Sequence, residues 1–467
     1  MSEEISKEIK KGDLTVGDPF KVLLKFALPL LLSMIFQQIY SLADNIVAGN
    51  MGGASSMLAS SAINASANIV NIFIAFSVGG TTGAAVIISR LFGQKKYALT
   101  KTAIFTSMIS LTTLAGILTG VGLLISRPLL IILNTTPDIL ELADQYLKIY
   151  LYGFFFMFIY NISNSIFTGL GDSRTPLYLL IVSSLSNIAC DIWFANLFEN
   201  IVEAVAWATF VCQGVISFVS VILLLRKISM IKTTEKAEIF SFKILGNMTK
   251  VAIPSILQQS FISIGNLLIQ SLIMSYAITE MFTGFGIALK INSLVTLSIV
   301  AMSNAISTFT AQNLGVDDIK RIKKGFIDII IIGEILVLIF TALLLIIPQQ
   351  VIGLFISEAT DGNRQLIIDY GSRFLYIVVP FYCVVSFKIM CDGILKGSQN
   401  MLAFTVCTFT DLFVRVILTY SFAPFMGFDA VCWSFSIGWV ITIFVSIFYI
   451  IRFFKKNKNL VAKTISE

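Results

Sequence analysis

The feature that most constrains this chain is a series of long apolar stretches, each able to cross the roughly 30 Å hydrocarbon core of a bilayer. A segment that crosses a bilayer must satisfy its own peptide groups, and a helix does so. Only 13% of the 467 residues are charged, against about 25% in soluble domains. The sequence therefore predicts an all-α integral membrane protein with twelve transmembrane helices. The stretches lie at about 24–48, 58–82, 100–124, 143–168, 176–198, 203–225, 246–275, 282–308, 326–348, 369–394, 402–424 and 429–451.

The basic residues fall mainly on one side of this twelve-span map. They gather in the N-terminal arm, at 90–101, at 226–250, at 320–324 and in the tail from Arg452. The positive-inside rule makes that side cytoplasmic, so we expect both termini of a multi-pass cell-membrane protein to lie in the cytoplasm. The net charge of +6 therefore reflects the orientation of the chain in the membrane and does not indicate nucleic-acid binding.

Several chemistries are disfavoured by what the sequence lacks. The chain has no His, which removes the usual metal ligand and the general base of neutral pH. Its six cysteines lie in apolar stretches without CxxC spacing, which argues against a disulfide framework. No GxxxxGK[ST] loop is present, which disfavours an ATP-driven pump. We therefore expect a protein that is not an enzyme and needs no organic cofactor.

A polar connection at 226–243 divides the chain into two halves that resemble each other. FALP at 26–29 matches VAIP at 251–254, and VAWAT at 205–209 matches VCWSF at 431–435. A repeat of six spans in one orientation predicts two six-helix bundles related by a pseudo-two-fold axis along the membrane normal, with the substrate site between them. That architecture is typical of transporters that alternate access.

The repeat and the charges together divide the chain into five segments. We expect a cytoplasmic arm at 1–20, an N-terminal lobe at 21–226, a cytoplasmic linker at 227–243, a C-terminal lobe at 244–452 and a cytoplasmic tail at 453–467.

Polar side chains inside the first half indicate a binding site. A carboxylate at the centre of a membrane helix costs roughly 2.5–3.5 kcal/mol on insertion scales, so Asp44 and Asp191 are candidate functional residues. Asn187 lies four residues before Asp191 and shares its helical face, and Thr209 lies in the next stretch. Carboxylate, carboxamide and hydroxyl oxygens suit a small hard cation, and two carboxylates can instead share a proton.

The second half carries its own charges within apolar stretches. Lys388 with Asp392, and Asp411 with Arg415, are spaced four apart and should pair along their own helices. Lys290 has no such local partner and is a candidate cross-helix counter-ion for Asp392.

Five motifs carry a resemblance to a known family. They are SLADNIVAGN at 41–50, TGLGDSRTP at 168–176, NIACD at 187–191, AVAWAT at 204–209 and AQNLG at 311–315. In this order and spacing the chain resembles the multidrug and toxic compound extrusion (MATE) family, in its bacterial multidrug-efflux branch, over 17–455. The resemblance implies two six-helix bundles in a V and export of bulky, mostly cationic amphiphiles in exchange for Na⁺ or H⁺.

The same resemblance assigns residues to the site. It implies a cation site at Asp44, Asn187, Asp191 and Thr209, and drug contacts at Gln37, Tyr40 and Asn164. Many sodium-driven relatives place a Glu in the seventh helix, whereas this chain has Gln258 and Gln259 there, so Asp392 is at most the remnant of a second cation site.

The expected partners are small amphiphilic cations and the lipid bilayer, with the protein acting as a monomer. Two alternatives stay open. A lipid-linked saccharide flippase of the same superfamily would need a strongly cationic cavity. A membrane enzyme would need a nucleophile with a base, or a metal cluster.

Overall fold

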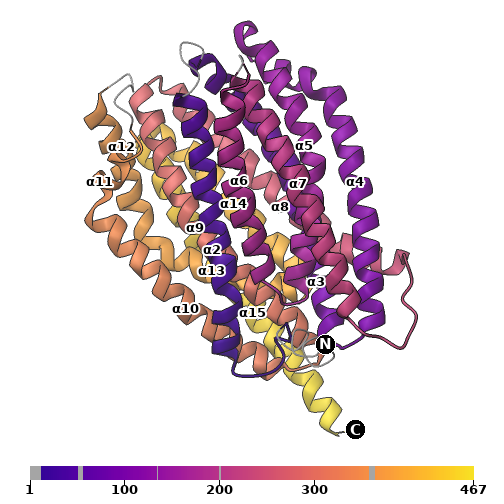
Figure 1. Ribbon diagram of the computed structural model, residues 1–467. Coiled ribbons are helices and arrows are strands. Elements are labelled where there is room, and N and C mark those ends of the chain that lie inside the picture. Colours follow the sequence, from indigo (N-terminus) through magenta and orange to yellow (C-terminus); the bar gives the residue numbers. More distant parts are fainter. Residues whose placement is uncertain (1–11, 51–55, 134, 199–200, 357–362, 467) are drawn as a thin grey trace. The chain divides into compact units, whose positions relative to one another are not determined.

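The structure is a computed structural model that describes residues 12–50, 56–133, 135–198, 201–356 and 363–466, and Figure 1 follows the chain from indigo to yellow. Side chains at 39–61, 64, 68, 201–202 and 458–466 lie outside the described part. Within those ranges every regular element is a helix. The helices of the first half of the chain are α2 (Pro19–Asn50), α3 (Ser56–Gly93), α4 (Tyr97–Ile132), α5 (Pro137–Gly169), α6 (Arg174–Ala195) and α7 (Ile201–Met230). Those of the second half are α8 (Phe242–Ser275), α9 (Thr279–Gly315), α10 (Ile319–Ile346), α11 (Pro348–Gly353), α12 (Arg364–Val378), η2 (Val379–Phe381), α13 (Tyr382–Gly397), α14 (Met401–Met426) and α15 (Phe428–Ser466).

The described helices include 12 that are long and apolar enough to cross a membrane, which confirms the predicted number of spans. One of them, Arg364–Gly397, is assembled from α12, η2 and α13. Pro380 lies in the 3₁₀ turn η2 between the two α-helices. Proline has no backbone N–H to donate, so it interrupts the α-helical hydrogen bonds at this point.

Close packing divides the chain into two compact units. The first unit comprises Met1–Thr15 and Leu28–Ser260. Its centre is α5, which packs against α3, α4 and α7, while α6 packs against α7. Phe154 on α5 meets Phe73 and Phe158 edge to face, with ring centroids 5.3 and 5.6 Å apart. Such edge-to-face contacts add about 0.5–1.5 kcal/mol to the burial of each pair.

In the first unit, glycines allow α3 to approach the early part of α8 closely. A Cβ added to Gly79 would lie 2.5 Å from the backbone nitrogen of Ile256. A Cβ added to Gly83 would meet the backbone oxygen of Met248. Only glycine fits at these two positions without a shift of one helix against the other.

The second unit comprises Val16–Ala27 and Phe261–Glu467. Within it α9 packs against α10, α12 and α13, and α14 packs against α15. The segment before α2 is tied to the start of α10, because Lys324 pairs with Asp18 at 2.9 Å and Arg321 Nη1 donates to the backbone oxygen of Gly17 at 2.5 Å. Asp318 caps α10 by accepting the backbone N–H of Arg321 at 2.9 Å.

Two helices are divided between the units, and both contain a proline. The division of α2 falls between Ala27 and Leu28, next to Pro29, and that of α8 follows Ser260, beyond Pro254. These prolines are the ones that the sequence repeat aligns. The lobe boundaries expected from the sequence, 21–226 and 244–452, stay a prediction.

Candidate functional site

The first unit buries two of the predicted cation-site residues on one face of α6. Asn187 is 2% exposed and Asp191 is 0% exposed. They lie four residues apart and so occupy successive turns on the same side of the helix. Both take part in interactions within the protein. A fully buried carboxylate in a membrane-spanning helix is costly in its charged form, so its surroundings decide what it binds.

The neighbouring helix α7 completes the described part of this site. Its buried Cys212 interacts with Cys190, Asn187 and the carboxylate of Asp191. Thr209 is half-buried and precedes Cys212 by one turn, on the same face of α7. The hydroxyl of Thr209 is therefore carried by the face of α7 that meets Asn187 and Asp191.

Two further polar side chains of the first unit hold buried oxygens. The Asn164 Oδ1 on α5 and the Gln213 Oε1 on α7 are buried, and neither accepts a hydrogen bond from a described residue. A buried acceptor without a donor costs about 1–3 kcal/mol. Both atoms are therefore suited to accept a hydrogen bond from a bound molecule. Asn164 is one of the three drug-contact residues that the family resemblance implies.

The remaining predicted residues of the first unit lie on α2. Gln37 is exposed. Tyr40 and Asp44 fall within α2, but their side chains lie outside the part of the chain whose side chains the structure describes. The described site thus comprises Asn187 and Asp191 on α6 with Thr209 on α7. Among the described residues no group of three or more Cys, Asp or Glu could hold a metal ion.

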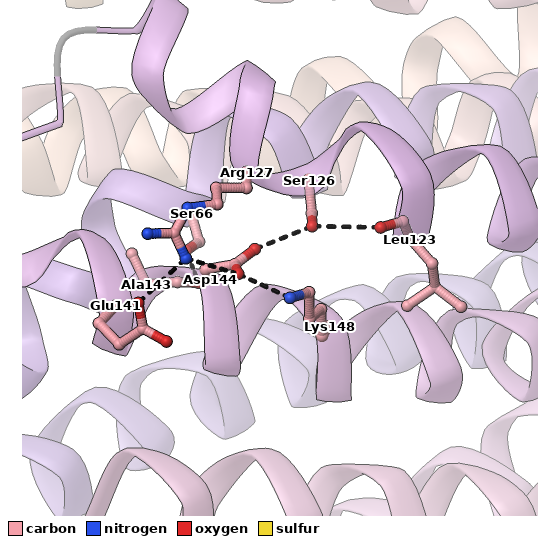
Figure 2. A network of polar contacts seen from close by, with 8 residues as sticks. All are labelled: Ser66, Leu123, Ser126, Arg127, Glu141, Ala143, Asp144 and Lys148. Carbon is pink, nitrogen blue, oxygen red and sulfur yellow. Dashed lines mark hydrogen bonds and ion pairs between the residues drawn. The ribbon is translucent and has the colours of Figure 1, made fainter.

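A second buried carboxylate, Asp144 on α5, lies in a polar network that Figure 2 shows from close by. Its side chain is 2% exposed, its Oδ1 accepts a hydrogen bond from Ser126 Oγ at 2.9 Å, and its Oδ2 pairs with Lys148 Nζ at 2.7 Å. Arg127 Nη1 lies 3.9 Å from Asp144 Oδ2 and 3.0 Å from Glu141 Oε2. Two carboxylates and two cations therefore neutralise each other here.

This network ties three helices of the first unit together. Ser126 and Arg127 come from the end of α4, and Asp144 from the start of α5. Ser66 Oγ on α3 donates to the backbone oxygen of Ala143 at 3.2 Å. Sequence reasoning did not single out Asp144. The available signal was its spacing of four residues from Lys148, the pattern used for the charged pairs of the second half.

In the second unit the spacing of four residues produces the two expected ion pairs. Lys388 Nζ lies 3.0 Å from Asp392 Oδ2, and both side chains are buried. Arg415 Nη2 lies 2.8 Å from Asp411 Oδ2. The Arg415 guanidinium also lies over the ring of Phe435, 4.4 Å from its centroid. A cation over an aromatic face gains further electrostatic stabilisation.

Lys290, the proposed counter-ion of Asp392, lies elsewhere. Its side chain on α9 is exposed, and the carboxylate of Asp392 is paired with Lys388. The partner on the same helix lies one turn away, whereas Lys290 belongs to another helix. The local pair therefore takes the place of the cross-helix pair.

Twelve apolar spans in two compact units, with polar side chains buried within the spans, define a multi-pass membrane protein. The MatE family model matches residues 29–193 and 254–421, two segments that begin at the aligned prolines Pro29 and Pro254. The chain therefore belongs to the MatE family, whose members are secondary transporters and not enzymes.

Curated relatives and solved structures agree with this family. The chain is 24% identical to the probable multidrug resistance protein YpnP of Bacillus subtilis over 90% of its own length and 92% of that protein. It is 20% identical to the multidrug export protein MepA of Staphylococcus aureus over 90% of each chain. Its fold is similar to that of a solved structure described as the outward-facing conformation of a multidrug resistance MATE family transporter of the MOP superfamily. The TM-score is 0.88, at 23% identity, over 96% of this chain and 99% of the other.

Proposed function

We propose that this protein is an antiporter that exports bulky, amphiphilic, mostly cationic compounds across the cell membrane in exchange for Na⁺ or H⁺. The observation that carries the proposal is Asp191, a carboxylate that is 0% exposed within a membrane-spanning helix, beside Asn187. The names of YpnP and MepA, a resistance protein and an export protein for multiple drugs, support export as the direction.

The chemistry of the buried site suits a coupling ion. Burial in low dielectric disfavours a bare carboxylate, and either a proton or a small cation removes that cost. Asn187 and Thr209 add a carboxamide oxygen and a hydroxyl oxygen, and hard cations prefer oxygen ligands of this kind. Na⁺ and H⁺ can therefore compete for one site that we assign to Asp44, Asn187, Asp191 and Thr209.

Ion binding is coupled to drug binding because the ion-site residue and two of the drug-contact residues lie close together along α2. Asp44 lies one turn beyond Tyr40 and two turns beyond Gln37 along the helix. Ion binding from the outside repacks this part of α2, so the drug loses its contacts with Gln37, Tyr40 and Asn164. Return to the inward-facing state then releases the ion to the cytoplasm, where we also place both termini.

The energy available is sufficient for export. A membrane potential of 100 mV supplies roughly 2.3 kcal/mol for each charge that moves inward. Since 1.4 kcal/mol corresponds to a tenfold concentration ratio, one net positive charge moved inward per cycle supports a drug gradient of roughly 50-fold. A drug that carries one positive charge outward therefore requires two entering cations per cycle for that gradient.

The test is efflux of a fluorescent amphiphilic cation from proteoliposomes, with the Na⁺ and pH gradients imposed separately. We expect Asp44→Asn and Asp191→Asn each to abolish gradient-driven efflux while the protein still reaches the membrane in normal amount. Asp138→Asn, which removes an exposed carboxylate at the start of α5, is the matched control and should transport normally. Full efflux by either site variant would refute the proposal.

A further inference from the structure

A long groove runs between α6 and α7 of the first unit, with the end of α5 contributing to its floor. Its cavity volume is about 790 Å³, and apolar side chains such as Leu179, Val182, Val215 and Ile216 make up most of its walls. Phe167 from α5 lies at its base. This volume falls within the range of roughly 300–1,000 Å³ that is typical of ligand sites.

The rims of the groove are strongly exposed although they are apolar. Val182 on α6 is 59% exposed and Val215 on α7 is 62% exposed. Both belong to helices that are candidate membrane spans. Exposed apolar side chains on a membrane span are suited to contact with the hydrocarbon of the bilayer. The apolar walls of the groove are therefore suited to hold an acyl chain.

One end of the groove is basic. Asp172, Arg226 and Lys227 line this end, and Lys227 Nζ pairs with Asp172 Oδ2 at 3.3 Å. The Asp172 carboxylate also accepts the backbone N–H groups of Arg174 and Thr175, at 3.2 and 3.1 Å, at the start of α6. Its charge is thus already compensated by a cation and a helix N-terminus.

The surplus positive charge at this end belongs to Arg226, whose side chain is exposed. Arg226 lines the groove and forms no ion pair with any described residue, and Arg174 begins α6 beside Asp172. The two basic side chains that line this end, Arg226 and Lys227, exceed the single carboxylate of Asp172, so the apolar channel has a net positive mouth. A ligand that fits both features has an anionic head and a hydrocarbon tail.

We propose that this groove binds an anionic phospholipid from the leaflet that meets the Arg226 end, with its phosphate on Arg226 and Lys227 and one acyl chain lying between Val182 and Val215. Basic clefts between membrane helices bind anionic head groups, and a basic residue near the membrane surface strengthens such binding. A zwitterionic lipid has the same acyl chains, but its head group also carries a positive charge. That charge is repelled by the basic side chains at the mouth of the groove.

The acyl chain ends near the candidate ion site. Cys190 and Cys212 line the far part of the groove, and Cys190 is adjacent in sequence to Asp191. A bound lipid therefore lies against the helix turn that carries Asp191. Lipid binding itself requires no antiport and can be measured without transport.

The binding experiment is native mass spectrometry of the purified protein titrated with phosphatidylglycerol or phosphatidylcholine. We expect tighter binding of phosphatidylglycerol, and a loss of about fivefold in its affinity in Arg226→Gln, the effect of one basic residue at an anionic lipid. Val215→Trp fills the groove and should lower the affinity for both lipids. Arg452→Gln and Ile417→Trp change similarly exposed residues on α15 and α14 and should bind as the wild type does.

Cys190 provides an independent readout inside the groove. All six cysteines lie in the described part of the chain, and only Cys190 and Cys383 are partly exposed. In a Cys383→Ser background, phosphatidylglycerol should slow the reaction of Cys190 with a membrane-permeant maleimide, and Arg226→Gln should reduce that protection. Equal binding of the two lipids, or unchanged binding in Val215→Trp, would overturn the proposal. So would protection of Cys190 by an amphiphilic cation alone, which would make the groove a drug site.

Discussion

Removal of the charge of Asp144 is expected to loosen the end of the first unit where α3, α4 and α5 meet. Asp144→Asn keeps the size of the side chain and one acceptor oxygen for Ser126. It removes the charge that pairs with Lys148 at 2.7 Å and with Arg127 at 3.9 Å. Figure 2 draws both pairs. The substitution therefore isolates the electrostatic contribution of a carboxylate that is 2% exposed.

The magnitude follows from the exposure of the partners. Lys148 and Arg127 are 47% and 51% exposed, so each pair is worth only about 0.2–1 kcal/mol. The hydrogen bond from Ser126 to the ionised carboxylate is worth about 1.5–3 kcal/mol and falls by roughly half when the acceptor becomes neutral. We therefore expect Asp144→Asn to lower the free energy of unfolding by about 1–3 kcal/mol.

The measurement is thermal unfolding of the detergent-solubilised protein followed by circular dichroism. Glu141→Gln is the matched control, because it removes a carboxylate that pairs with the same Arg127 but is 64% exposed. Its effect should stay below about 1 kcal/mol. Adding Lys148→Met to Asp144→Asn should cost less than the sum of the two single changes, because the pair is already broken. If Asp144→Asn unfolds at the same temperature as Glu141→Gln, burial does not strengthen this network and the reasoning fails.

Two further outcomes follow from the packing of each unit. Gly79→Ala places a Cβ 2.6 Å from the Cα of Ile256 and should destabilise the first unit by about 1–3 kcal/mol in the same unfolding assay, while Gly120→Ala, with no atom within 4 Å of its added Cβ, should not. The hydrogen bond from Lys324 lowers the pKa of Asp18 below its ordinary value, so the contact stabilises the second unit above that ordinary pKa and is lost as the pH falls through the lowered one. Hydrogen exchange at 16–20, corrected for intrinsic rates, should speed up on acidification in the wild type and show no such step in Asp18→Asn.

The number of spans could be predicted from the sequence because length and hydropathy along one segment decide whether it can cross a bilayer. The shared buried face of Asn187 and Asp191 could be predicted for a similar reason, since their spacing fixes it on any helix. The spacing of four residues also predicted the ion pair of Lys388 with Asp392, which forms with an N–O distance of 3.0 Å. Cation binding by Asn187 and Asp191 stays a prediction.

What the sequence could not supply depends on how separate helices meet. Asp144 lies at the edge of an apolar stretch, and its burial arises only when Ser126 and Arg127 at the end of α4 pack against it. Lys290 is comparable, since a pairing across helices cannot be read from spacing and the structure leaves its side chain exposed. The groove between α6 and α7 likewise depends on how two spans diverge, which hydropathy does not encode.

Three carboxylates within the described helices each pair with a basic residue one turn away on the same helix, whereas Asp191 has no such neighbour, and this contrast supports the coupling-ion site that we propose. Asp144 in the first unit, and Asp392 and Asp411 in the second, each have a basic residue one turn away on the same helix and pair with it, so a counter-ion is built into each of those helices. In the first unit the residues one turn from Asp191 along α6 are Asn187 and Ala195, neither of which can carry a charge. At Asp191 the helix thus supplies a carboxamide oxygen, whereas the helices of the three paired carboxylates supply a cation. A carboxylate beside a carboxamide is suited to bind and release an ion. A carboxylate that pairs with a basic residue on its own helix is suited to a structural role.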